Sequence, residues 1–383
     1  MKVLIISGAS FTKGYGIEKF IENLVMEDVS GDVQFTIMYP YFTKDELFFL
    51  DKKDIKYIPI FIPIPPHWPG GKTLQLVFFN FTVFLKVLFN RRKYDILHTN
   101  GEKGGLAYLA RRQGTVFTIH GYSFDSFRNV RNELKLVPKV TTLIWSLYAS
   151  ILEKISYLLS RAPVEIGEFA GEKYRYWLKE RRSYKIPIGV KKANFLSSAC
   201  NELKKENGLN EKCLIALWIG GDPKRKGLYE AIQAVEGKKN VVLFVIGCMP
   251  DIIRSNNVII KGRVHLKELE RLYNGADMLI FPSKYEGLPA VVMESVSYGI
   301  PVIGLKKPFM QNILGNDYPL LCTNTNELSK KVENLAIDPL FLTNMKTLAK
   351  EISLNFTSYK MAKQYHDLYE RLCNKNDFRE RGE

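Results

Sequence analysis

The chain has 383 residues, 46% of them hydrophobic and 25% charged, which is typical of globular proteins and excludes a disordered or fibrous one. This length suffices for two ordinary domains, and the formal net charge of +15 favours an anionic ligand or surface. The five cysteines are scattered and include no Cys-x-x-Cys pair, which argues against a disulfide framework or a zinc site. No DNA- or RNA-binding module is recognisable, so nucleic acid is not an expected partner.

The first half of the chain alternates short apolar runs with longer helical patterns, which predicts an α/β domain with a parallel sheet. An expected helix covers residues 17–29. The expected strands are 2–7, 33–39, 56–62, 95–99 and 114–120. Because the N-terminus runs directly into the first of these strands, no signal peptide is expected.

The most hydrophobic segment, residues 74–89, is interrupted by Asn80, Thr82 and Lys86 and is shorter than a bilayer span. The favoured interpretation is a buried core helix, and no transmembrane helix is expected. A second interpretation stays open. Aromatic helices over 78–93 and 145–159, with the basic stretch 172–185, would together rest on an anionic bilayer.

The second half repeats the same pattern, so two doubly wound Rossmann-like units are expected in series. Expected helices cover 226–235 and 265–276, and a final helix covers 356–372. The expected strands are 213–221, 240–247, 257–262, 277–283 and 300–305. The junction is placed within residues 186–195, where Pro187 and Gly189 interrupt the pattern.

Two loops of the first unit are candidates for ligand contact. Gly14 and Gly16 precede the first helix and would let a phosphate approach its N-terminus, although a plain tight turn explains them equally well. His120 ends a predicted strand and would contact a sugar hydroxyl or phosphate, or serve as a structural histidine. His98, at the preceding strand end, has the same two interpretations.

The second unit carries a basic loop between a strand and a helix. Lys224, Arg225 and Lys226 crowd this loop before Gly227, an arrangement suited to clamping a diphosphate. A solvated basic turn is the alternative. The spacing of a Walker A loop is absent.

The stretch YEGLPAVVMESVSYG places Glu286 and Glu294 on either side of a helix start at Pro289. The free N–H groups from Ala290 onward mark an anion site, whereas the two carboxylates are suited to the vicinal hydroxyls of sugars and riboses. A sugar–diphosphate–ribose ligand fits this combination. No Asp-x-Asp or histidine cluster lies nearby, so a metal site is not expected.

These motifs resemble glycosyltransferase family 4, whose members are retaining enzymes with the GT-B fold. FPSKYEGLPAVVMESVSYGIPVIG resembles the family's E-x7-E region, and GYGIEKFIENL, FTIHGY and IPIGV resemble further family segments. The resemblance implies two Rossmann-like domains facing a central cleft. It implies an N-terminal acceptor domain over 1–187, completed by a C-terminal helix over 360–383, and a C-terminal donor domain over 188–359.

The resemblance also implies roles for individual residues. Glu294 would hold the donor ribose, Glu286 would contact the transferred sugar, and Lys226 would clamp the diphosphate. His120 would touch the donor sugar. The remaining donor-binding candidates are Gly14, Gly16, Lys224, Arg225, Gly262, Val264, Gly287, Leu288 and Ala290. Gly221 stands where the family usually has Arg, so Lys224 or Arg225 would have to replace that charge.

The function implied is transfer of a hexose from a UDP- or GDP-sugar to an acceptor hydroxyl, with retention and without a metal or other cofactor. A glycan, a lipid-linked sugar or a small molecule would be the acceptor, and the protein would be cytoplasmic, with peripheral attachment to the inner face of the membrane left open. Two alternatives remain: a sugar-nucleotide 2-epimerase of the same fold, and a non-catalytic partner that binds nucleotide sugar. The missing Arg at Gly221 motivates the second.

Overall fold

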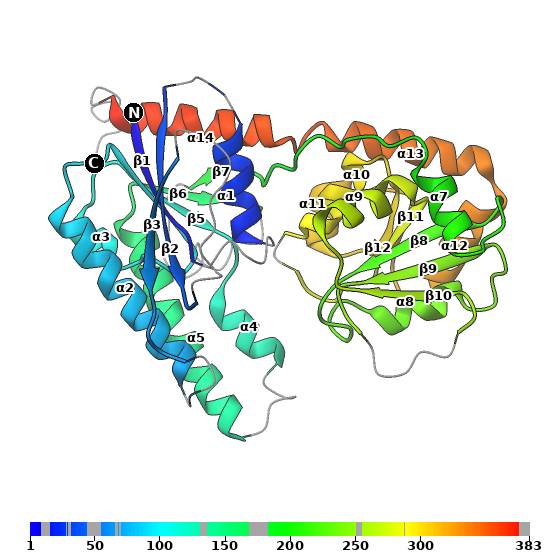
Figure 1. The fold of residues 1–383 in the computed structure, drawn as a ribbon, viewed down its shortest axis with the longest axis horizontal. Helices are drawn as coiled ribbons and strands as arrows, with labels where there is room; N and C mark the ends of the chain where they lie inside the picture. The colour runs from blue at the N-terminus through cyan, green and yellow to red at the C-terminus, as the bar shows by residue number, and fades with distance from the viewer. Residues whose placement is uncertain are drawn as a thin grey trace. The chain divides into compact units, whose positions relative to one another are not determined.

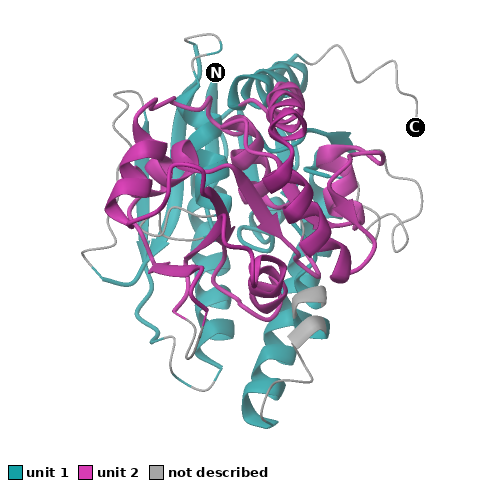
Figure 2. Ribbon diagram, turned by 90° about the vertical axis from the view of Figure 1, so that its right-hand side faces the viewer, with its two compact units in different colours: residues 1–189, 358–383 teal, residues 190–357 magenta. Residues whose placement is uncertain are grey.

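The computed structural model describes residues 1–8, 16–27, 29, 32–43, 55–65, 68, 70–130, 136–167, 183–249, 255–286 and 288–374. It divides into two compact units (Figure 2). Unit 1 comprises residues 1–189 and 358–383, and unit 2 comprises residues 190–357. Each unit is a parallel α/β layer structure with its own sheet.

The sheet of unit 1 has seven parallel strands in the order β3-β2-β1-β4-β5-β6-β7 (Figure 1). The strands are β1 (Lys2–Ile6), β2 (Gln34–Tyr41), β3 (Lys56–Phe61), β4 (Ile96–Asn100), β5 (Thr115–Ile119), β6 (Ala162–Glu165) and β7 (Tyr184–Lys185). The first five confirm the predicted strands. Because the chain winds outward in both directions from β1 and β4, the topological switch point lies between those two strands.

The helices of unit 1 are α1 (Ile17–Met26), α2 (Gly71–Phe89), α3 (Ala107–Ala110), α4 (Ser123–Val130), α5 (Leu136–Leu159) and α14 (Ser358–Cys373). The last helix, α14, comes from the far end of the chain and buries Met361, Tyr365 and Tyr369 in the same core as β1 and α1. The Tyr365 hydroxyl lies 2.8 Å from Thr118 Oγ1, and that of Tyr369 lies 2.6 Å from His98 Nδ1. The C-terminal helix is therefore part of the unit 1 core.

Helices α2 and α5 run side by side and pack on one another through Leu76, Ala149 and Leu152 (Figure 1). The expectation of a buried core helix over 74–89 is wrong for the outer side of α2, where Phe81 is 54% exposed. Apolar side chains surround this helix on all sides, but one face of a helix can pack against the unit while the opposite face has no neighbour within it. The outer side of α5 is exposed in the same way, as at Ile151.

The sheet of unit 2 has six parallel strands in the order β10-β9-β8-β11-β12-β13. They are β8 (Leu214–Ile219), β9 (Val241–Ile246), β10 (Val258–Gly262), β11 (Met278–Phe281), β12 (Val302–Leu305) and β13 (Leu321–Cys322). The helices are α7 (Ala199–Glu206), α8 (Leu228–Val235), α9 (Leu266–Gly275), α10 (Ala290–Ser297), α11 (Pro308–Leu314), α12 (Asn326–Ile337) and α13 (Pro339–Ser353). The switch point of this sheet lies between β8 and β11.

Candidate active site

The carboxyl ends of β8 and β11 lie side by side at the switch point of unit 2, where open α/β sheets bind their ligands. The loop after β8 covers residues 220–227, and the loop after β11 covers residues 282–289. The backbone N–H of Lys284 donates to the carbonyl of Arg225 at 3.0 Å, which joins the two loops. The basic loop and the loop that carries Glu286 therefore form one site.

Two glycines allow the loops to come this close. Gly227 has a left-handed conformation with φ of 70°, and a Cβ there would lie 2.6 Å from the Pro282 carbonyl oxygen. A Cβ on Gly220 would collide with the side chain of Lys226, which crosses that position. The Lys226 Nζ lies 5.5 Å from the centre of the Phe281 ring, and Trp218 Nε1 donates to the Lys226 carbonyl at 3.1 Å. Lys226 is thus held in a fixed direction by the end of its own sheet.

Arg225 is fixed on both sides of the site. Its Nε donates to Asp222 Oδ2 at 3.3 Å, and its Nη1 donates to the Tyr285 carbonyl at 2.7 Å and to Glu286 Oε1 at 2.9 Å. Lys224, by contrast, is exposed to solvent. Of the two candidates to replace the charge missing at Gly221, Arg225 is the one turned toward Glu286.

Glu286 is the carboxylate on which both cations converge. Its Oε1 accepts a hydrogen bond from Ser283 Oγ at 3.0 Å and lies 3.7 Å from Lys226 Nζ. Burial lowers the pKa of the Lys226 ammonium, and the Glu286 carboxylate acts in the opposite direction. Because Arg225 also pairs with Asp222, two carboxylates balance these two cations, and an anion bound here would compete with Glu286 for both of them.

Glu294 has different surroundings on α10. Its Oε2 accepts a hydrogen bond from the Tyr273 hydroxyl at 2.9 Å, and Tyr273 stacks on Tyr298 with ring centres 5.1 Å apart. The two glutamates of the motif are therefore held by different partners, Glu286 by cations and Glu294 by a phenol. Between them, Ala290 begins α10, and Leu288 precedes it and is half-buried. Gly287 lies outside the described residues.

The predicted residues Gly262 and Val264 lie at the carboxyl end of β10, which pairs with β9. Gly262 is buried with φ of 64°, and its carbonyl accepts from the Gly247 N–H at 2.7 Å, where β9 ends. A Cβ on Gly262 would come 2.8 Å from Met249 Sδ. Val264 follows and is half-buried. Gly262 therefore ends β10 and Val264 follows it, at the strand next beyond β9 from the switch point.

In unit 1, His120 follows β5 and is half-buried. Its Nε2 lies 2.9 Å from Asn100 Oδ1, and the Asn100 amide donates to the Ile6 carbonyl at 3.3 Å. Since an amide oxygen only accepts, Nε2 carries the proton and Nδ1 has the free lone pair. Burial lowers the His120 pKa to about 3, so this imidazole is neutral near pH 7.

Residues 200–352 match the family model described as Glycosyl transferases group 1. Unit 2 contains a group 1 glycosyltransferase domain. The chain is accordingly a transferase of the glycosyltransferase class, as the resemblance of its motifs implied.

Curated relatives of this glycosyltransferase cover both units. It is 23% identical over 307 residues to the O-antigen biosynthesis glycosyltransferase WclY of Escherichia coli, covering 73% of this chain and 80% of that one. It is 26% identical over 265 residues to the UDP-Gal:alpha-D-GlcNAc-diphosphoundecaprenol alpha-1,3-galactosyltransferase of Escherichia coli, covering 61% and 62% of the two chains.

Solved structures confirm the fold of the glycosyltransferase as GT-B. A sucrose-phosphate synthase from Thermosynechococcus elongatus aligns with a TM-score of 0.72 at 17% identity, covering 97% of this chain and 98% of that one. Anabaena HepE, solved with UDP and glucose, aligns with a TM-score of 0.69 at 13% identity, covering 97% and 99%. Identities this low establish the architecture alone.

The remaining candidate residues of unit 1 are His98, Gly14 and Gly16, and the structure places only some of them near a strand end or helix start. His98 is fully buried in β4, with Nδ1 on Tyr369 and Nε2 2.7 Å from Thr118 Oγ1, so it is a structural histidine. Gly16 has φ of 72° and precedes α1, where its carbonyl accepts from the Phe20 N–H at 3.1 Å. Gly14 lies outside the described residues.

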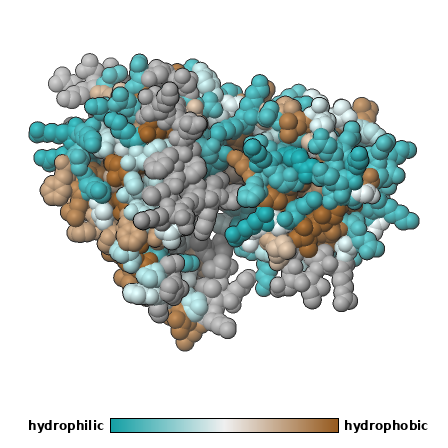
Figure 3. All heavy atoms as spheres, viewed as in Figure 1, coloured by the Kyte–Doolittle hydropathy of each residue, from teal (hydrophilic) through white to brown (hydrophobic). Residues whose placement is uncertain are grey.

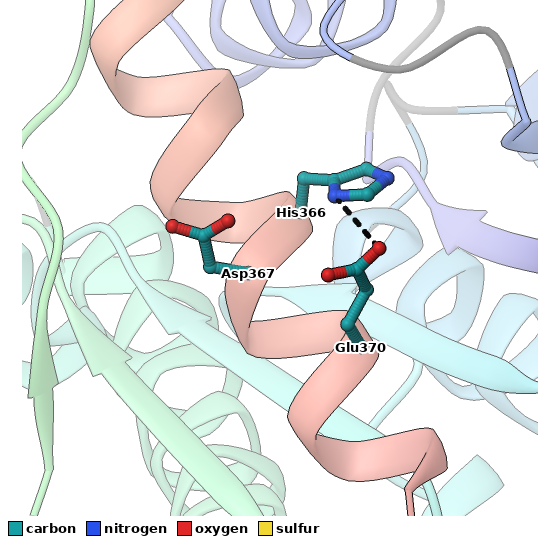
Figure 4. Close-up of side chains that lie close together, drawn as sticks. All are labelled: His366, Asp367 and Glu370. Carbon is teal, nitrogen blue, oxygen red and sulfur yellow. Dashed lines mark ion pairs between the residues drawn. The ribbon is translucent and has the colours of Figure 1, made fainter.

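One cluster of possible metal ligands occurs among the described residues, on α14 of unit 1. His366, Asp367 and Glu370 of α14 offer ligand atoms within 4.8 Å of one another. Figure 4 shows His366 and Glu370 facing one another, with 3.6 Å between Nδ1 and Oε1, while Asp367 points from another side of the helix. Exposed groups of this kind are common without an ion, so we assign no metal here.

Sequence reasoning missed the residues that hold the predicted ones in place. Asp222 and Ser283 orient Arg225 and Glu286, and Tyr273 orients Glu294. Ser283 had a signal, since it is the serine of the Pro-Ser pair before the motif. Tyr273 had none, because it lies on α9, a helix predicted from its periodicity that carries no binding motif.

Proposed function

We propose that the protein transfers a hexose from a UDP- or GDP-sugar to an acceptor hydroxyl, with retention of configuration and without a metal ion. The observation that carries this proposal is the convergence of Arg225 and Lys226 on Glu286 at the switch point of unit 2. Carboxylate and phosphate oxygens accept the same hydrogen bonds from guanidinium and ammonium groups. In this proposal, Glu286 occupies the position in which the donor diphosphate would otherwise be bound.

The donor would then exchange partners with Glu286. The diphosphate takes the hydrogen bonds of Arg225 and the charge of Lys226, and the free N–H groups at the start of α10 add to them. Glu286, released from Arg225, is left beside the sugar and accepts hydrogen bonds from its hydroxyls. Glu294, already oriented by Tyr273, accepts those of the ribose.

The proposed reaction follows from the charges at this site. The bond between the sugar C1 and the diphosphate oxygen breaks, and a bond from the acceptor oxygen to C1 forms on the same face. The acceptor proton passes to a departing phosphate oxygen. Arg225 and Lys226 stabilise the negative charge that develops on the leaving group. In this proposal they take the place of a divalent cation, which would stabilise the same charge.

The acceptor is proposed from the relatives. One of them is named for a diphosphoundecaprenol-linked substrate and another for O-antigen biosynthesis. A lipid-linked glycan of this chemistry is the acceptor class that we propose here, with the transfer at a cytoplasmic membrane surface. The donor proposal does not depend on this choice.

Calorimetric titration with UDP-glucose, UDP-galactose and GDP-mannose tests the donor site. Removing the charged side chain of Lys226 or Arg225 by substitution with Ala should weaken binding of the preferred donor about tenfold to a hundredfold. Glu294→Ala should weaken it as well, through the ribose. Lys239→Ala is the matched control, because this lysine is exposed in the same unit and lies outside the site.

The choice between Arg225 and Lys224 is tested in the same titration. Lys224→Ala removes one charge from an exposed side chain, so its effect should stay within about threefold. Unchanged donor affinity in the Arg225, Lys226 and Glu294 variants would contradict the proposed site. Slow donor hydrolysis without acceptor, followed by NMR in excess EDTA, reports both the retained anomer and the independence from metal.

A further inference from the structure

The outer faces of α2 and α5 together form an exposed apolar surface on unit 1. Figure 3 shows apolar side chains gathered at the lower left, over these two helices. Large hydrophobic side chains exposed by 37% to 81% make up this surface, which we call the α2–α5 face. Its members are Leu74, Val77, Phe78, Phe81, Phe89, Leu136, Val137, Val140, Ile144, Leu147, Ile151 and Leu158. Contiguous apolar surface of this kind marks an interaction site in soluble proteins.

The exposed charged residues of the two helices are all basic. Residues 70–94 contain no Asp or Glu, but they contain Lys72, Lys86, Arg91, Arg92 and Lys93, all of them exposed. The sole acidic residue of α5, Glu153, is buried and accepts hydrogen bonds from the Ser123 backbone N–H and hydroxyl. Over residues 72–93 and the described residues of α5, the exposed charged side chains are all basic, and an apolar face bordered in this way matches an anionic lipid surface, which offers acyl chains beneath negative headgroups.

The opposite side of α2 is bound to the rest of unit 1. Phe79 and Val83 are buried there, and the Asn80 side-chain oxygen accepts from the Gly104 N–H at 2.9 Å. The Gln75 amide donates to the Ile64 carbonyl at 2.6 Å. By length and composition alone, α2 would suffice to cross a membrane. Its polar contacts and its buried apolar residues favour a helix that lies on a surface, because crossing would require all of these contacts to break.

We propose that the α2–α5 face docks unit 1 on an anionic lipid bilayer. Its exposed Phe, Leu and Ile side chains enter the interface between headgroups and acyl chains. The lysines and arginines around it contact the negative headgroups, and their aliphatic stems cover neighbouring apolar surface. This inference does not depend on the donor site, and its readout is binding to lipid.

Sedimentation of the whole chain with vesicles tests the docking. We expect binding to equimolar phosphatidylglycerol and phosphatidylcholine, weaker binding to phosphatidylcholine alone, and a decrease with added salt. The double variant Phe81→Ser with Ile151→Ser should lower the partition coefficient about tenfold or more. The double variant Arg91→Gln with Arg92→Gln should lower it about tenfold and flatten its dependence on salt.

Matched controls come from unit 2. Ile337 and Leu340 are 72% and 70% exposed, so Ile337→Ser with Leu340→Ser removes as much exposed apolar surface from elsewhere. Lys191→Gln with Lys192→Gln removes two exposed charges. Neither control should change vesicle binding. The docking is contradicted if Phe81→Ser with Ile151→Ser binds vesicles as well as the control Ile337→Ser with Leu340→Ser does. It is also contradicted if the wild-type protein does not bind anionic vesicles. It is also contradicted if Phe81→Ser with Ile151→Ser only converts a dimer to a monomer.

Discussion

In each unit a lysine side chain crosses a glycine that follows a strand beside the switch point, but the charged groups around the two lysines differ. In unit 1 the Lys103 side chain crosses Gly8 after β1, and in unit 2 the Lys226 side chain crosses Gly220 after β8. Lys103 pairs with the adjacent Glu102 at 3.9 Å, and the strand ends around it carry neutral Thr99, Asn100 and His120. Lys226 instead shares Glu286 with Arg225.

The winding of each sheet therefore sets where a ligand binds, and the loops and outer helices set which ligand it is. Unit 2 concentrates several opposite charges at its switch point, whereas unit 1 has one Lys103–Glu102 pair among neutral polar groups there and exposes apolar surface on α2 and α5.

The largest effect concerns the two faces of α2. Phe79 is 2% exposed and Phe81 is 54% exposed. Phe79→Ala should lower the free energy of unfolding of unit 1 by about 3 to 5 kcal/mol, because it leaves a cavity, whereas Phe81→Ala should change it by roughly 0.5 kcal/mol. Hydrogen exchange of the β1 and β4 amides would measure both. A similar loss in the two variants would show that the α2–α5 face serves stability instead of docking.

The next effect concerns His98, which burial keeps neutral in unit 1. Burial, and secondarily the nearby His120, lowers the His98 pKa from 6.5 to about 3. Between these values the unfolded chain binds a proton that the folded chain does not, so stability falls as the pH falls. The loss from His98 should reach about 2 kcal/mol at pH 5. Hydrogen exchange at pH 7 and pH 5 would measure it.

His98→Gln is the matched variant for this effect, because an amide keeps hydrogen bonds to Thr118 and Tyr369 without titrating. Its unit 1 stability should fall less between pH 7 and pH 5 than that of the wild type. Equal losses in both proteins would show that other groups cause the acid sensitivity. Unit 2 amides supply the internal reference.

The smallest effect concerns the orientation of Glu294. Tyr273→Phe removes the hydroxyl that donates to Glu294 Oε2 and keeps the ring that stacks on Tyr298. Donor affinity should fall about threefold to tenfold, in line with one lost hydrogen bond to a charged group. Titration with the preferred nucleotide sugar measures it. An unchanged donor affinity would show that the hydrogen bond from Tyr273 to Glu294 does not contribute to donor binding.

Most of the fold was predictable because its strands are long apolar runs. The strands that escaped prediction are short: β6 has four residues that include Pro163 and Glu165, and β7 and β13 have two each. Such segments carry no periodic signal. The exposure of α2 also escaped, since an apolar sequence does not tell whether neighbouring elements cover it.

The sequence indicated the residue types of the candidate site, and only the structure shows the contacts that join them. Lys226, Arg225 and Glu286 were singled out because of their charge and their position after strands. The hydrogen bond from Arg225 to Glu286 joins residues 61 apart in the sequence, so it depends on the pairing of β8 with β11. For the same reason, the sequence could not decide between Lys224 and Arg225.

The docking of α14 in unit 1 has a consequence for synthesis on the ribosome. Tyr365 and Tyr369 supply hydrogen-bond partners to Thr118 and His98, which are translated some 250 residues earlier. Until the last helix leaves the ribosome, Thr118 and His98 lack these hydrogen-bond partners, and the apolar core around them lacks the side chains of α14 that pack on it. Unit 2 lies wholly between the two segments of unit 1, so it is complete first. The first strands made therefore belong to the unit that is finished last.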